Sequence, residues 1–205
     1  MTSEQLAVRE HLVLPRQFQD LLFREARSAS AFQDEPVSGE QLAAIYDLVK
    51  YGPTALNQQP LRLVALRSEQ ARRRLLPYLH GHNQQRAARA PLVVLLAADL
   101  NFHQRLPELF PAGLLLRDEF AGRPAERAAQ ARFNALLQAG YFIIGVRCAG
   151  LAAGPMTGMD RAAVNREFFP AGDLEALMVV NIGRPLPKTR PRLPRLPYQD
   201  VVRIL

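Results

Sequence analysis

The protein is a chain of 205 residues, of which 48% are hydrophobic and 22% charged. This length and composition exclude a disordered or fibrous chain and predict a single domain, residues 1–205, with a full hydrophobic core. The formal net charge of +7 would suit a nucleic-acid partner. The positive excess lies in residues 62–89 and 184–205, however, and the rest of the chain is net acidic.

The chain has one cysteine, Cys148, which excludes an internal disulfide and a cysteine-based zinc site. Its first five residues lack the basic start and apolar run of a secretory signal. No apolar stretch approaches the roughly 20 residues that cross a bilayer. We therefore expect a cytoplasmic protein without membrane contact, in which Cys148 lies in the core or in a subunit interface.

The sequence predicts a mixture of helices and strands in the first half of the chain. A first helix ends near Arg27, and Ser38 with Gln41 forms the capping box of a second helix, which Gly52-Pro53 ends. Apolar runs then predict a strand, a helix and a buried strand, over residues 61–66, 68–79 and 91–96.

One long helix, residues 125–149, dominates the second half and is apolar on most faces in its later turns. Such a helix must be buried on all sides, which indicates either a central helix or one packed against a second subunit. A glycine-containing turn follows, then a short helix capped by Asp160 and a strand over residues 177–182. Residues 184–205 form a Pro- and Arg-rich arm that stays loose or wraps over another surface.

Hydrolytic and metal chemistry fit this sequence badly. It contains no nucleophile elbow, no zinc-protease motif, no P-loop and no dinucleotide-binding glycine fingerprint. His80 and His82 flank a glycine, but without a third ligand nearby they are more typical of a polar loop than of a metal site. We therefore expect no metal.

Three loop segments gather small polar side chains. Residues 27–32 offer a guanidinium and two hydroxyls, which bind a phosphate or cap a helix end. Residues 52–60 offer one hydroxyl and three carboxamides, which suit the edge of a heterocycle or an ordinary polar turn. Residues 154–158 place glycine on either side of Pro-Met-Thr, which allows close approach to a flat ligand or a turn into the next helix.

In this order and spacing, the three segments and the arm resemble the nitroreductase family of flavoproteins over nearly the whole chain. The residues that match the family's motifs are Arg27, Ser28, Ser30, Pro53, Thr54, Asn57, Gln59, Pro60, Gly154, Pro155, Gly158, Met159, Asp160, Arg192 and Arg195. The stretches most similar to the branch that includes malonic semialdehyde reductase are residues 46–54, 106–111, 154–158 and 191–197. Gln58-Gln59 and Ser30 depart from patterns common in the family.

The resemblance implies an α+β fold with a mixed central sheet flanked by helices. It also implies a homodimer that binds FMN at two interface sites, with residues 184–205 as a domain-swapped arm over the partner subunit. The residues implied for the FMN phosphate are Arg27, Ser28 and Ser30, with Arg195 in preference to Arg192. Those implied for the flavin and its ribityl chain, from the opposite subunit, are Pro53, Thr54, Asn57 and Gln59. Those implied to lie along the isoalloxazine are Pro155, Met156, Thr157 and Gly158.

In the implied reaction, NADH or NADPH gives a hydride to FMN, and a small carbonyl compound such as malonic semialdehyde, or a nitro compound, takes it from the reduced flavin. The cofactor carries the chemistry, so no catalytic side chain is expected. Arg86 is a candidate for holding the carboxylate of an acidic acceptor. Two other functions stay open: dehalogenase-like or flavin-fragmenting chemistry on the same fold, and nucleic-acid binding through the basic segments.

Overall fold

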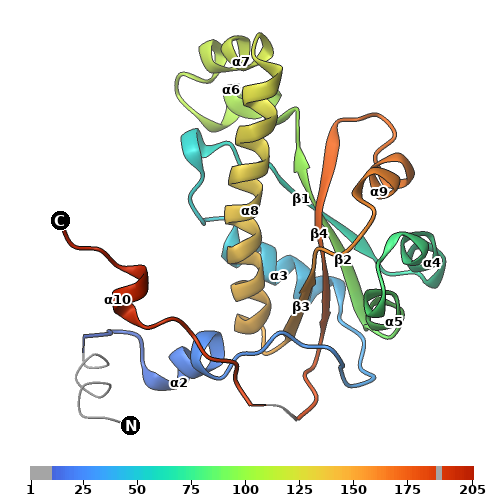
Figure 1. Ribbon diagram of the computed structural model, residues 1–205. Coiled ribbons are helices and arrows are strands. Elements are labelled where there is room, and N and C mark those ends of the chain that lie inside the picture. The colour runs from blue at the N-terminus through green and yellow to red at the C-terminus, as the bar shows by residue number, and fades with distance from the viewer. Residues whose placement is uncertain (1–10, 188–190) are drawn as a thin grey trace.

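The computed structural model describes residues 11–187 and 191–205. In this part of the chain, four strands form one sheet in the order β1-β2-β4-β3, which lies between two layers of helices (Figure 1). The strands are β1 (Leu61–Leu66), β2 (Leu92–Asp99), β3 (Ala152–Met156) and β4 (Leu174–Gly183). The helices are α2 (Arg16–Gln19), α3 (Gly39–Val49), α4 (Glu69–Leu75), α5 (His82–Ala88), α6 (Leu106–Leu109), α7 (Gly113–Ala121), α8 (Pro124–Cys148), α9 (Arg161–Phe168) and α10 (Tyr198–Val201).

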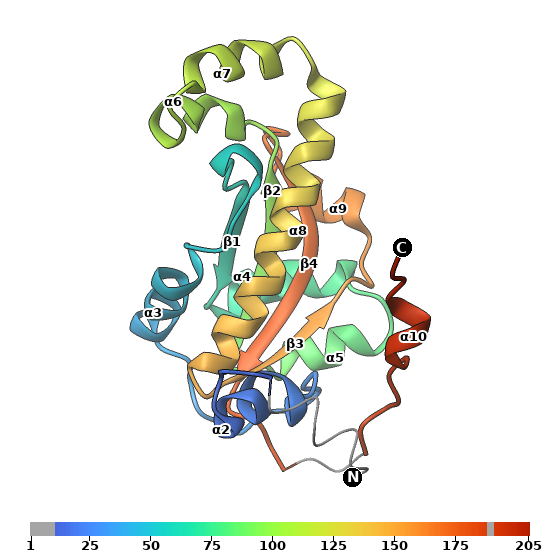
Figure 2. The ribbon, with the colours of Figure 1, turned by 90° about the vertical axis from the view of Figure 1, so that its left-hand side faces the viewer.

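The strand β2 carries core residues on both of its faces, because side chains alternate along a strand. Leu92, Val94 and Leu96 pack in one apolar cluster with residues of α3 and α8. Val93 and Leu95 pack in another cluster with residues of α4, α5 and α9. Figure 2 shows α8 crossing one face of the sheet, with α4, α5 and α9 behind it.

Every pairing in the sheet is antiparallel, so the expected mixed sheet is wrong for the strands described. The reason lies in the connections. Between β1 and β2 the chain passes through α4 and α5, which lead out and back, and Leu66 consequently pairs with Val93 at the end of the sheet where the chain left it. A parallel pair would need a crossover that returns the chain to the opposite end.

Most elements confirm the predictions. The capping box is present, since the Ser38 Oγ accepts from the Gln41 N–H and the Gln41 side chain accepts from the Ser38 N–H. Ser68 and Asp160 cap α4 and α9. The first helix consists of α2 and a π-helical turn that follows it directly. This turn ends at Arg24, three residues before the expected end near Arg27.

The strand β3 was not predicted, and Gly154 and Pro155 lie inside it rather than in a turn. Gly and Pro weaken strands in general, which is why a turn was expected. A proline is tolerated here because β3 is the last strand of the sheet order, and an edge strand can lack a ladder donor.

The helix α8 buries one face and exposes another within the chain. Ala139, Phe142 and Val146 are buried against the sheet, whereas apolar side chains on the other face are solvent-exposed, namely Phe133, Leu136, Leu137 and Tyr141. Cys148 is exposed at the last position of α8, so its placement in the core is wrong, and its placement in a subunit interface stays a prediction. None of the helices described is long and apolar enough to cross a membrane.

The arm runs away from the sheet and forms α10 shortly before the C-terminus (Figure 1). Residues 188–190 of the arm lie outside the described residues. Leu193, Leu196 and Tyr198 are exposed, while Arg192 contacts the end of the first helix, as described below. The exchange of arms between two subunits stays a prediction.

Candidate functional site

The first and third loop segments lie side by side. The Ala29 N–H donates to the Ala153 carbonyl in β3 at 2.9 Å. A Cβ at position 154 would lie only 2.3 Å from the Ala29 carbonyl oxygen. Only glycine therefore permits this close approach, and the fold brings residues 27–30 to the edge of β3, as a shared ligand would require.

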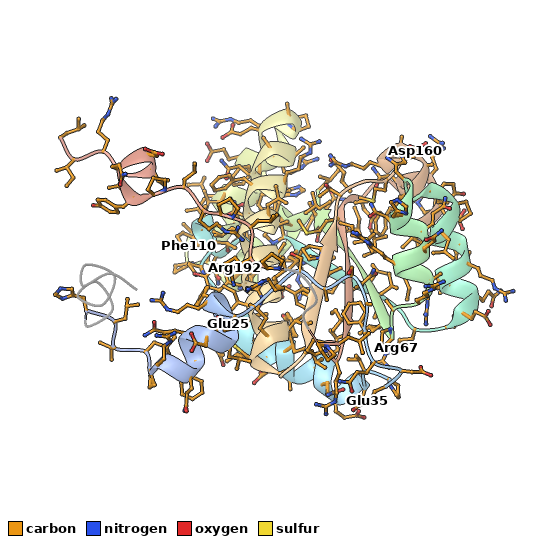
Figure 3. All side chains as sticks on the ribbon, turned by 60° about the horizontal axis from the view of Figure 1, so that its bottom comes forward. Glu25, Glu35, Arg67, Phe110, Asp160 and Arg192 are labelled. Carbon is orange, nitrogen blue, oxygen red and sulfur yellow. The ribbon has the colours of Figure 1, made fainter. Side chains whose placement is uncertain are left out.

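Arg27 and Arg192 bind the same helix end. The Arg27 Nη1 donates to the carbonyls of Arg24 and Ala26, at 3.4 and 3.1 Å. The Arg192 Nη2 donates to the Ala26 carbonyl at 2.8 Å, to the Phe23 carbonyl at 3.0 Å and to the Arg24 carbonyl. Figure 3 shows Arg192 on the arm close to the segment that carries Glu25. The carbonyls at a helix C-terminus attract cations, which explains the contact.

Arg147, in the last turn of α8, is a third guanidinium at this helix end. Its Nη1 donates to the Leu22 carbonyl at 2.7 Å. Burial first, and then the Arg192 charge, lower the pKa of Arg147 below its ordinary value. Its Nε and that of Arg27 are buried without a hydrogen-bond partner in the described part of the chain. Sequence reasoning missed Arg147, although a cation ending an apolar helix was a visible signal.

Of the remaining candidates for the phosphate, two serines lie close to Arg27 in the chain, whereas Arg195 makes contacts only within the arm. Ser28 and Ser30 follow Arg27 directly and are exposed. Arg195 is exposed, and its Nη1 donates only to the carbonyls of Leu193 and Pro194, both at 3.0 Å. The structure thus brings Arg192, and not Arg195, to Arg27.

The second loop segment is strained. Leu56, Asn57 and Gln59 have φ values of 53°, 53° and 45°, a left-handed conformation that non-glycine residues rarely adopt. The Asn57 side-chain amide donates to the Leu109 carbonyl at 2.9 Å, and the Gln59 amide donates to the Asn57 Oδ1 at 2.8 Å. The Thr54 Oγ1 accepts from the Gln59 N–H at 3.2 Å. Backbone strain of this kind persists where the surroundings enforce it, and it clusters at ligand sites.

Two polar residues of α8 enforce that shape. The fully buried Asn134 accepts from the Ala55 N–H at 2.8 Å and donates to the Gln58 Oε1 at 2.9 Å. Gln138 accepts from the Leu61 N–H at 2.9 Å. Gln58, a departure from the family pattern, is thus a buried anchor of the loop. Sequence reasoning missed both α8 residues; the signal was a polar side chain interrupting an apolar helix.

The turn after β3 is held by the loop that precedes α5 and by the first turn of α5. The Gly158 carbonyl accepts from the His80 N–H at 3.0 Å and from the Asn83 amide at 3.1 Å. A Cβ at position 158 would lie 2.7 Å from the Asn83 Nδ2. Met156 is buried, with its sulfur 3.8 Å from the Asn181 amide nitrogen, while Thr157 is exposed.

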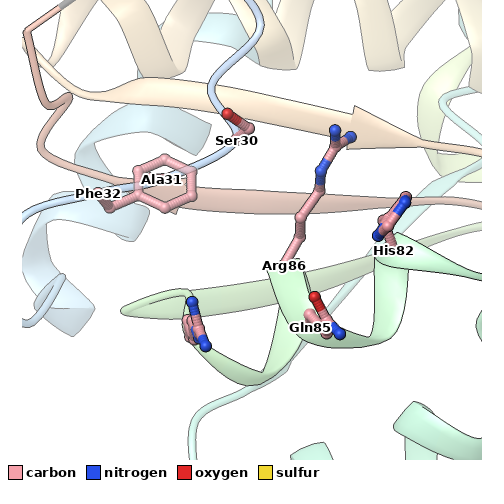
Figure 4. A pocket seen from close by; sticks show the side chains of 7 residues that line it. Ser30, Ala31, Phe32, His82, Gln85 and Arg86 are labelled. Atoms are coloured by element: carbon pink, nitrogen blue, oxygen red, sulfur yellow. The ribbon is translucent and has the colours of Figure 1, made fainter.

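A cleft of about 470 Å³ separates residues 30–32 from α5. Ser30 and Phe32 line one side, and His82, Gln85, Arg86 and Arg89 line the other. In Figure 4, Arg86 extends from α5 toward β3 and the backbone near Ser30. The structure therefore brings Arg86, a candidate from the sequence, to the first loop segment.

The second loop segment is not brought to the other two within one chain. It leads into β1, which is the edge strand opposite β3. Three strand spacings separate these edges, roughly 14 Å. Within one chain, residues 53–60 therefore do not lie beside residues 27–32 and 154–158.

The arginines of α4 are already engaged. Arg72 donates to the Ala90 carbonyl at 2.8 Å, Arg73 pairs with Glu69 at 2.5 Å, and Arg74 pairs with Glu167 at 2.6 Å. These contacts neutralise or occupy the charges that nucleic-acid binding through this helix would use.

The sequence matches the model of the Nitroreductase family over residues 23–184. A Streptomyces coelicolor protein named "Putative NADH dehydrogenase/NAD(P)H nitroreductase" is 56% identical over 192 residues, which cover 93% of this chain and 97% of that protein. A Leptothrix cholodnii protein of the same name is 42% identical over 185 residues, covering 90% of this chain and 94% of that protein.

Solved structures share the fold. The Bacillus subtilis protein ydfN has a TM-score of 0.77 at 25% identity, covering 92% of this chain and 99% of that one. A protein from Exiguobacterium sibiricum, crystallised in complex with FMN, has a TM-score of 0.78 at 18% identity and covers 91% of this chain and 96% of that one.

Proposed function

The chain belongs to the Nitroreductase family, and on this basis we propose that it is an FMN-dependent oxidoreductase that uses NADH or NADPH to reduce a small carbonyl or nitro compound. The relatives' names support the electron donor. The FMN complex of a protein with the same fold supports the cofactor.

The cluster of three arginines at the end of the first helix, Arg27, Arg147 and Arg192, fits an FMN phosphate. The buried Nε atoms of Arg27 and Arg147 have no hydrogen-bond partner in the described part of the chain, and unpaired buried donors are costly unless a ligand accepts from them. Ser28 and Ser30 add hydroxyl donors beside Arg27. A phosphate dianion would neutralise the repulsion between Arg147 and Arg192. This cluster is the observation that carries the proposal.

The arm arginine in this assignment is Arg192 rather than Arg195. Arg192 already shares carbonyl acceptors with Arg27. Arg195 makes only local contacts, with the carbonyls of Leu193 and Pro194.

The turn after β3 and the strained loop would hold the flavin. Pro155, Met156, Thr157 and Gly158 offer a flat backbone beside the first segment, to which Gly154 gives close access. Pro53, Thr54, Asn57 and Gln59 would complete the site from a second chain. The edge-to-edge separation of the two parts supports this division between subunits.

A homodimer would also cover the exposed apolar face of α8. Phe133, Leu136, Leu137 and Tyr141 recur at helical spacing and are exposed in the single chain. Obligate interfaces are rich in such side chains. We assign residues 184–205 to the partner's surface in this dimer and take residues 1–205 as one domain.

The bound flavin supplies hydride acceptance and donation, and the chain's own residues bind, orient and shield it. The arginine cluster would hold the phosphate end, and the loop over residues 53–60, which Asn134 holds in shape, would hold the ring end. No acid or base is needed for hydride transfer, so the chain's role is orientation and electrostatics. Arg86 would hold the carboxylate of a malonic semialdehyde-like acceptor.

The proposal is tested by the absorbance spectrum of the purified protein, before and after FMN is added and excess is removed. We expect flavin peaks at one equivalent per chain and oxidation of NADH or NADPH when para-nitrobenzoate or a small aldehyde acid is supplied. A protein that binds no flavin under either condition overturns the proposal.

A further inference from the structure

Arg62, on β1, connects the strained loop to the end of β2. Its Nη2 pairs with the Asp99 carboxylate at 2.5 Å, and its Nη1 donates to the carbonyls of Gln59 and Leu61, at 2.9 and 3.0 Å. The Arg62 side chain is 37% exposed and the Asp99 side chain 14%. A half-buried, charge-assisted contact of this kind is stronger than an ion pair exposed to solvent.

The contact with the Gln59 carbonyl matters because Gln59 has a left-handed backbone, with φ at 45°. A non-glycine residue keeps this conformation only where its surroundings enforce it. Both backbone polar groups of Gln59 are bound: its N–H donates to the Thr54 Oγ1 at 3.2 Å, and its carbonyl accepts from Arg62. Arg62 therefore supplies one of the two hydrogen bonds that hold the Gln59 backbone in place.

Asp99 extends this connection to the second anchor of the loop. Its Oδ1 accepts from the Asn101 N–H at 2.7 Å, which fixes the turn into the 3-10 helix Phe102–Arg105. Helix α6 follows directly, and the Leu109 carbonyl at its end accepts from the Asn57 side-chain amide at 2.9 Å. The carboxylate thus fixes both the arginine that binds the loop and the segment that leads to the loop's other anchor.

The ion pair is not needed to align the two strands. Every residue of β1 already pairs with β2 in the backbone ladder, and the Asp99 N–H donates to the Pro60 carbonyl at 2.8 Å. Changes to the side chains at positions 62 and 99 leave these backbone groups in place. What such a change removes is the contact with the Gln59 carbonyl and the support of the turn after β2.

We propose that Arg62 and Asp99 are positioning residues of the flavin site, which as an ion pair hold the loop over residues 53–60 in the shape that contacts the flavin ring. The inference rests on the proposed function, in which this loop holds the ring end of the flavin. Both side chains act through the loop, by way of the Gln59 backbone and the Asn57 side chain. Breaking the pair therefore weakens the ring contacts and leaves the phosphate contacts as they are.

The experiment compares wild-type protein with Arg62→Gln, Arg62→Lys, Asp99→Asn and the double variant Arg62→Gln/Asp99→Asn. Arg74→Gln is the matched control, because Arg74 on α4 likewise pairs with a carboxylate, that of Glu167 at 2.6 Å, and donates to a carbonyl at 3.3 Å. The measurements are Tm, the dissociation constants of FMN and riboflavin by fluorescence titration, and amide hydrogen exchange of residues 53–60 in the full-length protein with and without flavin.

We expect Arg62→Gln to raise the exchange rate of the amides in residues 53–60, and the Kd of both flavins, by about tenfold, because one charge-assisted hydrogen bond to the loop is lost. The factor should be equal for FMN and riboflavin, since the phosphate is bound elsewhere. Arg62→Lys should restore part of the loss, because lysine keeps the charge but lacks the planar fork that reaches the carboxylate and the carbonyl together.

Asp99→Asn should reproduce the effects of Arg62→Gln, and the double variant should be no worse than either single variant, as two residues that act as a unit require. Arg74→Gln should lower Tm without changing flavin affinity or the exchange of residues 53–60. This control separates a specific effect on the loop from a general loss of stability.

Three results overturn the inference: wild-type exchange of residues 53–60 in Arg62→Gln, the same exchange and affinity changes in Arg74→Gln, or fully additive effects in the double variant. Wild-type protein that binds no flavin overturns the proposed function itself. Wild-type protein that binds flavin, with Arg62→Gln indistinguishable from it, loses only the positioning role of the pair.

Discussion

Arg192 shows how a single side chain joins the arm to the candidate phosphate site. It donates to three carbonyls at the end of the first helix, where Arg27 also donates. Three cations in one place repel one another, and the helix C-terminus together with the Glu25 carboxylate, 4.0 Å from the Arg27 Nη2, offsets only part of that repulsion. A phosphate dianion bound among the three arginines would reduce this repulsion further.

We expect Arg192→Gln to weaken FMN binding by about tenfold, because one charge-assisted hydrogen bond to the phosphate is lost. Riboflavin, which lacks the phosphate, should bind wild-type protein and the variant equally. Fluorescence titration of both flavins measures this, and Arg195→Gln is the matched control. A loss of FMN affinity in Arg195→Gln alone would transfer the phosphate contact to that residue.

His103 gives the fold a pH dependence. The side chain is 3% exposed, and its Nδ1 has no hydrogen-bond partner in the described residues. Burial first, and then the Arg127 charge, lower the pKa of His103 below its usual 6.5, with Arg117 acting in the same direction and Asp99 against it. The unfolded chain therefore binds a proton that the folded chain resists.

We expect unfolding free energy to be unaffected by His103 above pH 6.5 and to fall as the pH drops below that value toward the lowered folded pKa. In this window the unfolded state binds more protons, so acid favours it. His103→Gln should flatten the decline in Tm between pH 6.5 and the folded pKa. His80→Gln, which alters an exposed histidine, should leave the decline intact, and equal slopes in all three proteins would refute the assignment.

Asn134 is the residue on which the strained loop depends most directly. Asn134→Ala leaves the Ala55 N–H and the Gln58 carboxamide without a partner in a buried place. We expect a loss of about 3 kcal/mol of stability by urea denaturation, together with weaker FMN binding. In Glu126→Ala, on the exposed first turn of α8, the free energy of unfolding should stay within about 0.5 kcal/mol of wild type. An equally small change in Asn134→Ala would show that the Asn134 hydrogen bonds are not needed for the loop.

At the scale of elements, the packing of α8 on α3 is set by one glycine. A Cβ at position 145 would lie 2.3 Å from the Val49 Cγ1 and 3.2 Å from the Ile45 Cγ2. Val and Ile have stiff side chains in a helix, so they cannot turn away readily. The close crossing matters for the site, because α8 also carries Asn134 and Gln138.

We expect Gly145→Ala to destabilise the fold by about 1–3 kcal/mol through overpacking. In an unpacked helix the same change would stabilise by about 1 kcal/mol. Gly122→Ala is the control, because its Cβ would have ordinary contacts, with the Glu119 carbonyl oxygen at 3.6 Å the nearest. Thermal denaturation distinguishes the two, and a more stable Gly145→Ala protein would contradict the close crossing.

At the scale of the whole molecule, the two halves of the candidate site face different edges of the sheet. Residues 27–30 lie along β3, and residues 53–60 lead into β1 at the opposite edge. The helix α8 crosses the face of the sheet between these edges (Figure 2), and its exposed apolar side chains are Phe133, Leu136, Leu137 and Tyr141. A second copy of the chain packed on these α8 side chains would cover the apolar surface, and the same contact would complete the site.

We therefore expect Phe133→Glu to convert a dimer into single chains, because it places a charge on a side chain that is 69% exposed in the chain and buried in the proposed interface. Sedimentation velocity measures the change, and FMN should be lost with it. Gln70→Glu adds the same charge on α4, across the sheet, and should leave the dimer intact. Wild-type protein that sediments as one chain with FMN bound would refute the shared site.

The sequence by itself determined the elements and the motif residues. Hydrophobic spacing and local caps act within a few residues, so the capping box at Ser38, the strand over residues 61–66 and the cap at Asp160 were all predicted correctly. The resemblance carried by the loop residues predicted the family, which the matches over residues 23–184 show. Local chemistry is enough for these conclusions because each depends on neighbours in the chain.

Only the tertiary structure decided which of these residues meet. The strand β3 forms despite Gly154 and Pro155 because β4 and Ala29 pair with it. The buried contacts of Asn134 with residues 55 and 58 span more than 75 positions, and no local pattern encodes such a distance. The antiparallel sheet and the choice of Arg192 over Arg195 at the first helix likewise follow from where the chain turns back, which is fixed by packing between segments far apart in sequence.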